Sequence, residues 1–438
     1  MATDTNGPYY DRLKLRLKSR LVGILSNRPD GGRFGMPRKE LEDCVRQAYF
    51  SLTDEGRSSK LSDDDEGRMF REVIDEVTGL GPIDQLMIDP SVSEVMVNGP
   101  DQVYVERNGV LERAEMKFRD VDHLRAVIER LLGGTGLSVT ESEPCVDGSL
   151  PDGGRINVII PPLVLNGPTI TIRKELRRFE MNEFVSLGTL SPQAAEFLEK
   201  CVKCKANLII SGGTSTGKTT LVSLLSVFIP AQERVITIEN VAELELLGRE
   251  HWIRLIAKSP NLEGRGEIPL RTLVRNALRM RPDRIILGEA RAGEALDVVQ
   301  AMHTGHDGVI TVLHANSPGA SLERLQTLML MSGLELPAQA CQAQIASAVD
   351  MIVHMSRYAD GSRRIGTISQ VLGVSSAGFE MEELFQFEVR GFRSDGVIEG
   401  DLHYTGARPK FLQKFHLNNV PVPEWINTSQ QPRVAATA

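Results

Sequence analysis

The stretch ISGGTSTGKTTL, residues 210–221, joins two apolar runs through a glycine-rich loop. It matches G-x-x-x-x-G-K-[ST] with Gly212, Gly217, Lys218 and Thr219. Glycines let backbone N–H groups approach phosphate oxygens, and a helix beginning near Lys218 adds the positive end of its dipole. The spacing therefore predicts that Lys218 pairs with the β- and γ-phosphates of a nucleotide while the Thr219 hydroxyl ligates Mg²⁺. The residues expected to contact ATP are Gly212, Gly213, Thr214, Ser215, Thr216, Gly217, Lys218, Thr219 and Thr220.

Carboxylates follow two other strand-like runs, at the ends where ligands of open α/β sheets bind. In RIILGEAR, Glu289 follows the apolar run, and Gly288 stands where an Asp would ligate the metal directly. We therefore expect Mg²⁺ to be held largely through water. Glu289 would lie near the γ-phosphate, either polarising the attacking water or contacting the metal through water. In TIENVAELE, Glu239 and Glu243 are four residues apart, and either could orient the attacking water.

Two histidines bracket the last core run, His306 in HTGHDG and His314 in VLHAN. In a nucleotide-hydrolysing core they could sense the γ-phosphate, although a lone histidine is usually structural. Together with His303 they could also suggest a metal site, but a buried strand would separate the two best candidates. The acids also have alternative roles without catalysis: Glu289 could cap the turn after its strand, and Glu243 could be a solvated carboxylate.

Length and composition describe a multidomain chain. At 438 residues it is too long for one typical core, so we expect two or three domains of about 100–200 residues each. The net charge of −8 does not suggest the concentrated basic surface that nonspecific nucleic-acid binding needs. The absence of a long apolar run and of an apolar signal segment in MATDTNGPYYDR predicts a cytosolic protein. An odd count of five cysteines argues against a disulfide framework and fits a reducing compartment.

The N-terminal part has helical and linker signals. Residues 9–28 place leucines at i, i+4 spacing among arginines and lysines, which predicts a basic amphipathic helix. Such a helix either packs in a small bundle or lies on an anionic membrane surface. We interpret two polar, glycine-containing stretches, 27–35 and 51–67, as solvated linkers around a short helical unit.

From 69 to 173 the pattern is mixed α/β, with Asn-Gly pairs that signal hairpins and a helix expected over 121–132. The expected strands are 93–99, 102–109, 155–162 and 168–174. Farther on, near-continuous apolar runs alternate with helical segments, which indicates a parallel sheet in a nucleotide-binding core. These runs are 207–212, 234–240, 284–290 and 308–316. Three smaller strands are expected after residue 350, at 351–357, 367–374 and 384–391.

Four ordered segments carry a resemblance to a known family. SGGTSTGKTT, TIEN, LVRNALRMRPDRIILGEAR and TGHDGVITVLHAN resemble the Walker A, Asp box, Walker B and His box of the secretion ATPase superfamily. That superfamily drives type II secretion, type IV pili and type IV secretion. Upstream, GLGPIDQL, SEVMVNG, LPDGGRINVIIPP and TIRK resemble the N-terminal domain of its CpaF-type branch, the motor of Tad (tight adherence) pili. The resemblance runs from about Leu80 to about Gly373.

The resemblance implies an α/β fold: a RecA-like P-loop NTPase core with a parallel-rich sheet, preceded by an α+β domain and a short helical region. The boundaries we expect are 1–66 for the helical region with linkers, 67–176 for the α+β domain, 177–190 for a hinge, 191–426 for the ATPase domain with its C-terminal extension, and 427–438 for a disordered tail. The resemblance also implies a homo-hexameric ring that uses ATP and Mg²⁺ on the cytosolic face of the bacterial inner membrane. Its expected partners are polytopic inner-membrane platform proteins, and no nucleic acid is expected.

The family's roles transfer by position. They give Lys218 and Thr219 as phosphate and Mg²⁺ residues, Glu289 as the Walker B glutamate, Glu239 and Glu243 as the Asp-box acids, and His306 with His314 as the His box. In such rings the nucleotide lies between the two domains, and Arg155 in LPDGGR and Arg173 in TIRK match arginines of the N-terminal domain that reach the phosphates. Guanidinium groups suit γ-phosphate charge, and hydrolysis would break these interactions and let the domains swing apart.

Two departures from the family keep alternatives open. Asn240 replaces the usual Asp of the Asp box, which removes a negative charge near the metal, and Ser149 replaces an arginine of VDxRLPDG.

Related alternatives are a type IV secretion traffic ATPase and an archaeal-type filament motor. From other classes come a nucleic-acid translocase, using the arginines of 275–284, and a nucleotide-gated scaffold that binds ATP without turnover.

Overall fold

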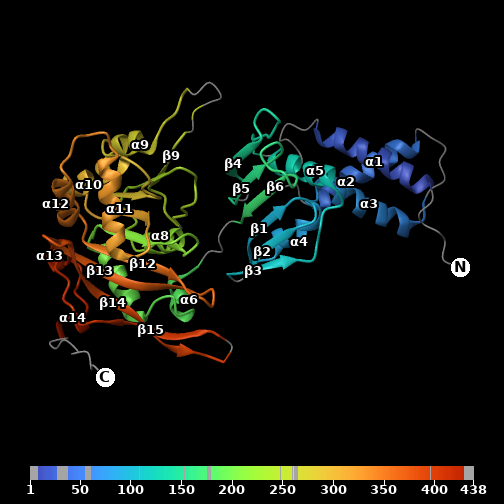
Figure 1. Ribbon diagram of the computed structural model, residues 1–438. Helices are drawn as coiled ribbons and strands as arrows, with labels where there is room; N and C mark the ends of the chain where they lie inside the picture. The colour runs from blue at the N-terminus through green and yellow to red at the C-terminus, as the bar shows by residue number, and fades with distance from the viewer. Residues whose placement is uncertain are drawn as a thin grey trace. The chain divides into compact units, whose positions relative to one another are not determined.

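The chain folds into two compact units, Met1–Arg177 and Arg178–Ala438, each with its own architecture (Figure 1). The computed structural model describes residues 8–26, 38–54, 61–107, 109–133, 135–151, 153–174, 179–246, 248–258, 260, 265–394 and 396–428. Among the helices within these ranges, none is both long and apolar enough to cross a membrane.

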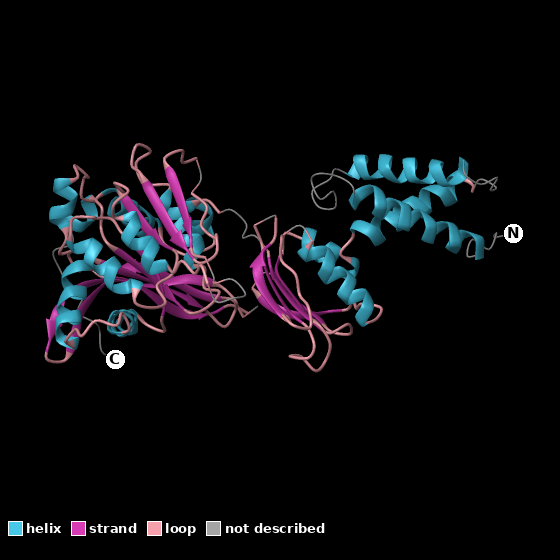
Figure 2. Cartoon of the chain, turned by 90° about the horizontal axis from the view of Figure 1, so that it is seen from above, coloured by secondary structure: helices cyan, strands magenta, loops and turns pink. Residues whose placement is uncertain are grey.

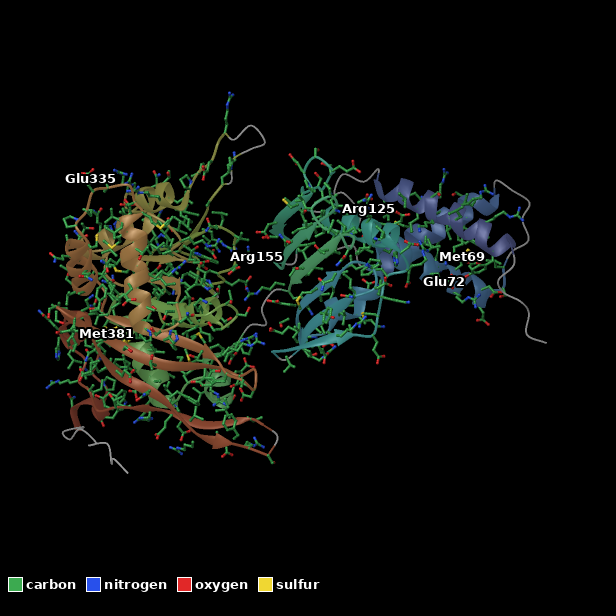
Figure 3. All side chains as sticks on the ribbon, in the orientation of Figure 1. Met69, Glu72, Arg125, Arg155, Glu335 and Met381 are labelled. Atoms are coloured by element: carbon green, nitrogen blue, oxygen red, sulfur yellow. The ribbon has the colours of Figure 1, made fainter. Side chains whose placement is uncertain are left out.

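The first unit begins with a bundle of three helices. They are α1 (Pro8–Ser26), α2 (Arg38–Asp54) and α3 (Asp63–Thr78). The leucines of α1 at i, i+4 spacing all face the bundle core: Leu13, Leu17, Leu21 and Leu25. On the polar side of α1, Lys14 pairs with Glu72 of α3, which Figure 3 labels, at 2.7 Å. Of the two expectations for this amphipathic helix, the bundle is therefore confirmed.

The linker predicted over 51–67 is wrong in part. Helix α2 continues to Asp54 and α3 begins at Asp63, and residues 55–60 between them lie outside the description. Ser62 precedes α3, and its Oγ accepts a hydrogen bond from the Asp65 N–H at 3.2 Å. Carboxylates in a first turn also complement the helix dipole, so the acidic run starts a helix. The linker predicted over 27–35 lies outside the described residues.

An antiparallel sheet with helices on its core side forms the rest of the first unit. In spatial order its strands are β3 (Val110–Ala114), β2 (Val103–Arg107), β1 (Val92–Asn98), β6 (Thr169–Arg173), β5 (Arg155–Ile159) and β4 (Cys145–Ser149). Its helical segments are η1 (Gly81–Ile83), α4 (Asp84–Ile88) and α5 (Val121–Leu132). Alternate residues of β1, such as Val95 and Val97, share a core with Leu124 and Ile128 of α5. The expected helix and strands of this region are confirmed.

The second unit is built on a nine-stranded sheet. In spatial order its strands are β15 (Ile398–Tyr404), β14 (Gly378–Phe392), β13 (Arg363–Ser375), β12 (Met351–Arg357), β7 (Leu208–Gly212), β11 (Ile310–His314), β10 (Arg284–Leu287), β8 (Val235–Glu239) and β9 (Trp252–Ile256). The strands from β12 to β9 run parallel, and β13 to β15 add antiparallel hairpins. The four predicted parallel strands are confirmed as β7, β8, β10 and β11, while β9 was not predicted.

Helices cover both faces of this sheet (Figure 2). They are α6 (Met181–Ser186), α7 (Pro192–Lys203), α8 (Lys218–Ser226), α9 (Leu270–Ala277), α10 (Glu294–His303), α11 (Pro318–Leu330), α12 (Ala338–Ala348), α13 (Leu412–Leu417) and α14 (Glu424–Thr428). Side chains alternate along β7, so Ile210 faces the core that includes α7 and α8, whereas Ile209 faces the core that includes α9 to α12. The sheet is therefore buried on both faces, and ligands can reach it at the strand ends.

Two expected segments contain ordered structure. The expected hinge at 177–190 includes α6, and Phe184 of that helix is buried in the core of the second unit. Helix α7 follows Ser191, whose side chain accepts from the Ala194 N–H, so the predicted helix start at Ser191-Pro192 is confirmed. The expected tail at 427–438 includes the end of α14, and 429–438 lie outside the described residues.

Candidate functional site

The glycine-rich loop leaves the carboxyl end of β7 and enters α8 at Lys218. Gly212 has φ 146°, and a Cβ there would lie 2.3 Å from the carbonyl oxygen of Met355 on neighbouring β12. Gly217 has φ 95° and precedes the first turn of α8. Both glycines therefore occupy backbone conformations that a side chain would oppose, as a loop wrapped around phosphates requires.

The Lys218 side chain is held in place by backbone carbonyls of the loop. Its side chain is buried, and its ammonium donates to the carbonyls of Gly212 at 3.1 Å and Gly213 at 2.5 Å. Its Nζ also lies 3.5 Å from Nδ1 of His314, at the end of β11. These contacts fix a cation at the N-terminal end of α8, where phosphate oxygens would also meet the helix dipole.

Glu239 and Glu243 form the next part of the site. At the end of β8, the buried Glu239 accepts from the backbone N–H groups of Glu243 at 2.9 Å and Leu244 at 2.8 Å. Burial raises the pKa of Glu239 despite these two hydrogen bonds. Glu243 accepts from the Thr219 hydroxyl at 3.4 Å, which joins the acidic segment to the phosphate loop.

Gly288 makes room for this arrangement. A Cβ at Gly288 would lie 2.8 Å from Cγ of Glu239, so the residue after β10 faces the Glu239 side chain at close range. An aspartate at this position would need that carboxylate to move. The structure thus supplies a steric reason for a glycine in place of a direct metal ligand.

Glu289 completes a chain of polar contacts that begins at Lys218. Its carboxylate lies 2.7 Å from the guanidinium of Arg291 and 3.4 Å from Nε2 of His314. Burial and the charge of Lys218 lower the pKa of His314, which keeps the imidazole neutral near pH 7. A neutral ring with its proton on Nε2 can accept at Nδ1 from Lys218 and presents its Nε2–H to the Glu289 carboxylate 3.4 Å away. His314 therefore lies between Lys218 and the Glu289 carboxylate.

Comparison with known proteins identifies the family. Residues 76–381 match the family model described as "Type II/IV secretion system protein". The chain belongs to that family. It is 34% identical to Rv3659c, a Mycobacterium tuberculosis protein named for conjugal transfer, over 67% of this chain and 85% of that protein. It is 30% identical to the conjugal transfer protein TrbB of Rhizobium radiobacter, over 70% of this chain and 92% of that protein.

A solved structure supports the fold. The ATPase DotB of Yersinia pseudotuberculosis aligns with a TM-score of 0.51 at 18% identity, covering 70% of this chain and 80% of that chain. The second unit accordingly has the α/β fold of the secretion-family proteins, with a RecA-like P-loop core, as the sequence predicted.

The structure of this secretion-family chain brings some predicted residues together and separates others. Lys218, His314 and Glu289 form one series of contacts, and Thr219 and Glu243 form a second. His306 precedes the amino end of β11, at the edge of the sheet opposite to His314, and its Nδ1 lies 3.3 Å from the Thr304 hydroxyl. Among the described residues, no group of three or more His, Cys, Asp or Glu side chains could hold a metal ion by itself.

Arg155 and Arg173 lie in the first unit, where they stand directly opposite each other on β5 and β6 (Figure 3 labels Arg155). Arg155 lies 3.4 Å from Asp147, and Arg173 lies 3.8 Å from Glu94. The two guanidinium groups share one face of the antiparallel sheet, because directly opposed residues do.

The oxygen donors near the phosphate loop fit Mg²⁺. This ion prefers oxygen ligands and is usually bound by one or two carboxylates together with water and substrate phosphates. The Thr219 hydroxyl and the Glu243 carboxylate supply such donors. Within the described part of the chain, Oε2 of Glu239 is buried and has no hydrogen-bond partner, which leaves an acceptor available to a water on the ion.

Sequence reasoning missed the residues that β12 brings to the loop. His354 stands opposite Ser211 in the register of β12 with β7, and its Nδ1 lies 2.9 Å from the Ser211 hydroxyl. Burial and the charge of Lys218 lower the pKa of His354. The pattern of MIVHMSR predicts a strand, but its place beside β7 depends on the order of strands in the sheet, which no local pattern gives.

Proposed function

We propose that this chain is an ATP-hydrolysing motor that works as a homo-hexameric ring at the cytosolic face of the bacterial inner membrane. It would power assembly, or both assembly and retraction, of a Tad-type or type IV pilus through inner-membrane platform proteins. The observation that carries the ATPase proposal is the unbroken series Lys218, His314, Glu289 beside the glycine-rich loop. It joins a phosphate-binding cation to a carboxylate placed to act on water.

Each residue has a task in this proposal. The loop N–H groups and Lys218 bind the β- and γ-phosphates, and their charge stabilises the transferring phosphoryl group. Mg²⁺, when bound near Thr219, neutralises charge on the phosphate oxygens. Glu289 orients and polarises the attacking water, and neutral His314 holds Glu289 in place through its Nε2–H. Glu239 positions Glu243 by accepting from its backbone N–H.

Arg155 and Arg173 are proposed to reach the γ-phosphate from the first unit. Their contacts with Asp147 and Glu94 are long and partly exposed to solvent, so exchanging them for phosphate contacts would cost little. Loss of the γ-phosphate would then remove an attraction between the two units, which couples hydrolysis to movement. Ser149, which replaces an arginine of the CpaF-type pattern, leaves one donor fewer.

Conjugal transfer and secretion relatives support a second candidate, a type IV secretion traffic ATPase. The nucleic-acid translocase alternative rested on the arginines of residues 275–284. Arg284 is buried against Glu233 at 2.5 Å, and Arg275 pairs with Asp297 at 2.7 Å, so these two guanidinium groups have partners within the protein, while Arg279 and Arg281 are exposed. The scaffold alternative rested on Asn240, which is exposed while the adjacent Glu239 points into the site.

Phosphate release from ATP tests the ATPase proposal, with the particle mass recorded on the same sample. We expect Mg²⁺-dependent turnover by a six-subunit particle. Lys218→Ala should abolish nucleotide binding and turnover, since it removes the cation at the phosphate loop. A Lys218→Ala protein that retained full turnover would contradict the assigned site, and a monomer with full turnover would contradict the ring.

A further inference from the structure

The hairpin of β12 and β13 extends past the end of the phosphate loop. Strand β12 pairs in parallel with β7, and Met355 stands opposite Gly212, the last residue of β7. Arg357 lies two residues farther along β12, on the same face as Met355 because side chains alternate. Strand β13 returns antiparallel with Arg363 directly opposite Arg357. The hairpin therefore carries two arginines on one face beyond the loop.

Arg363 packs against the loop itself. A Cβ on Gly217 would lie 3.4 Å from Cε of Met355 and 3.9 Å from Cδ of Arg363. Gly217 is the N-cap of α8, so the methylene stem of Arg363 rests beside the N-terminal end of that helix. The guanidinium group begins at the next atom. Arg363 is half-buried and Arg357 is exposed, which leaves the pair reachable from solvent.

The turn of the hairpin is fixed by hydrogen bonds. Asp360 accepts from the N–H and hydroxyl of Ser362 at 2.9 and 2.6 Å, and its second oxygen accepts from the Ile398 N–H at 2.9 Å. These bonds tie the turn to β15. Guanidinium groups placed opposite each other on such a braced hairpin present planar, charged donors in the geometry that suits a phosphate.

The order of strands decides which part of a nucleotide this pair would meet. In the spatial order β12-β7-β11-β10, His314 and Glu289 lie on the side of the loop where β11 and β10 are, and hydrolysis is proposed there. The hairpin lies on the opposite side of β7. If the terminal phosphates face Glu289, the nucleoside side of the phosphate chain faces the arginines.

We propose that Arg357 and Arg363 form a second phosphate-binding element, which holds the phosphate nearest the nucleoside in both ATP and ADP. The inference rests on the proposed function, because it assumes that the loop binds a nucleoside phosphate. It adds a subsite contributed by the C-terminal strands, separate from the arginines of the first unit. ADP would then remain bound after the γ-phosphate leaves.

Titration of ATP and ADP against Arg357→Gln and Arg363→Gln tests this element. Losing a hydrogen bond to a charged group should weaken binding of both nucleotides about tenfold or more. The loss should be the same for ATP and ADP and should shrink as salt is raised. Lysine at either position should restore part of the affinity. Arg390→Gln is the matched control, since Arg390 is an exposed β14 arginine paired with Asp401.

The results separate this inference from the proposed function. Unchanged affinity for both nucleotides in the two glutamine variants, with binding lost in Lys218→Ala, would overturn the inference alone. A loss confined to ATP would also overturn it, since it would place the arginines at the γ-phosphate. Binding retained in Lys218→Ala would overturn the proposed function. Arg363→Gln could lower the melting temperature of the nucleotide-free protein, because Arg363 is half-buried. In that case Arg357→Gln alone decides the test, because Arg357 is exposed and its replacement should leave folding unchanged.

Discussion

Two pairs of arginines stand directly opposite each other on antiparallel strands, one in each unit. Arg155 and Arg173 belong to the sheet of the first unit and lie near acids of that same sheet. Arg357 and Arg363 belong to a hairpin that continues from the strand beside the phosphate loop. The second pair is thus attached to the glycine-rich loop by its own sheet, whereas the first pair belongs to a separate compact unit.

This difference assigns the pairs different tasks. A pair fixed beside the loop can contribute to affinity at every stage, because its distance from the loop is set by the fold. A pair on a separate unit can contribute only in the arrangement that brings it to the phosphates, so it suits turnover and movement. Substitutions in both units can test this contrast.

The largest expected effect comes from the pair on the first unit. Replacing Arg155 and Arg173 together by glutamine should lower turnover about 10³-fold, since arginines that stabilise a transferring phosphoryl group contribute at least that much. ATP affinity should change little, because Lys218 and the loop remain. Steady-state phosphate release and nucleotide titration measure the two effects. Arg113→Gln, on strand β3 of the same sheet, is the control and should keep normal turnover.

If the double variant lost nucleotide affinity and turnover in equal proportion, the contrast between the two pairs would fail. Turnover at the normal rate would instead show that Arg155 and Arg173 of the first unit take no part in hydrolysis.

A smaller effect, on the free energy of unfolding, is expected at Glu239, which accepts hydrogen bonds from two backbone N–H groups. Glu239→Ala leaves the N–H groups of Glu243 and Leu244 without their acceptor, at a cost of about 1–3 kcal/mol for the buried Leu244 N–H. Glu239→Gln keeps one carbonyl acceptor and should recover most of the free energy of unfolding. Urea unfolding of the three proteins measures it. Equal stability of the alanine and wild-type proteins would show that Glu239 does not hold this loop.

The smallest effect concerns pH. The pKa of His314 is lowered from its ordinary value of 6.5 by burial and by Lys218. A histidine with a lower pKa in the folded state gives its full stabilisation above pH 6.5 and loses it as the pH falls through the folded-state value. Wild type should therefore lose free energy of unfolding on acidification from pH 8 to pH 5. His314→Asn should lose less over that range, because one of the proton-linked groups is gone.

Urea unfolding at pH 8, 7, 6 and 5 follows this difference. The two proteins share every other histidine, so the comparison isolates His314. A steeper acid loss in His314→Asn would mean that the imidazole is stabilised in its charged form and cannot donate to Glu289 as proposed.

The sequence predicted the local parts of the site well. The loop from Gly212 to Thr219 has a motif whose glycines and lysine define both conformation and chemistry, and it lies between β7 and α8 as expected. Apolar runs ending in Glu239, Glu289 and His314 marked parallel strands, and parallel strands present their carboxyl ends at one edge. These three side chains could therefore be grouped before their contacts were known.

What the sequence did not predict depends on distant neighbours. Arg363 reaches Gly217 only because β12 lies beside β7, although well over a hundred residues separate these strands in the chain. The role of Gly288 depends on the Glu239 side chain of an adjacent strand. The acidic run near Asp63 suggested a linker because its charge density outweighed its helix-start signal. Such contacts follow from sheet order and register, which composition and periodicity do not specify.

The central proposal is that Glu289, beside Lys218 and His314, activates water for ATP hydrolysis. The most direct measurement compares Mg²⁺-dependent phosphate release by wild type and Glu289→Gln, with ATP affinity determined on both proteins. We predict that the variant binds ATP as wild type does but turns it over about 10²–10⁴ times more slowly, because the general base is lost. Turnover by Glu289→Gln at the wild-type rate would contradict this role for Glu289.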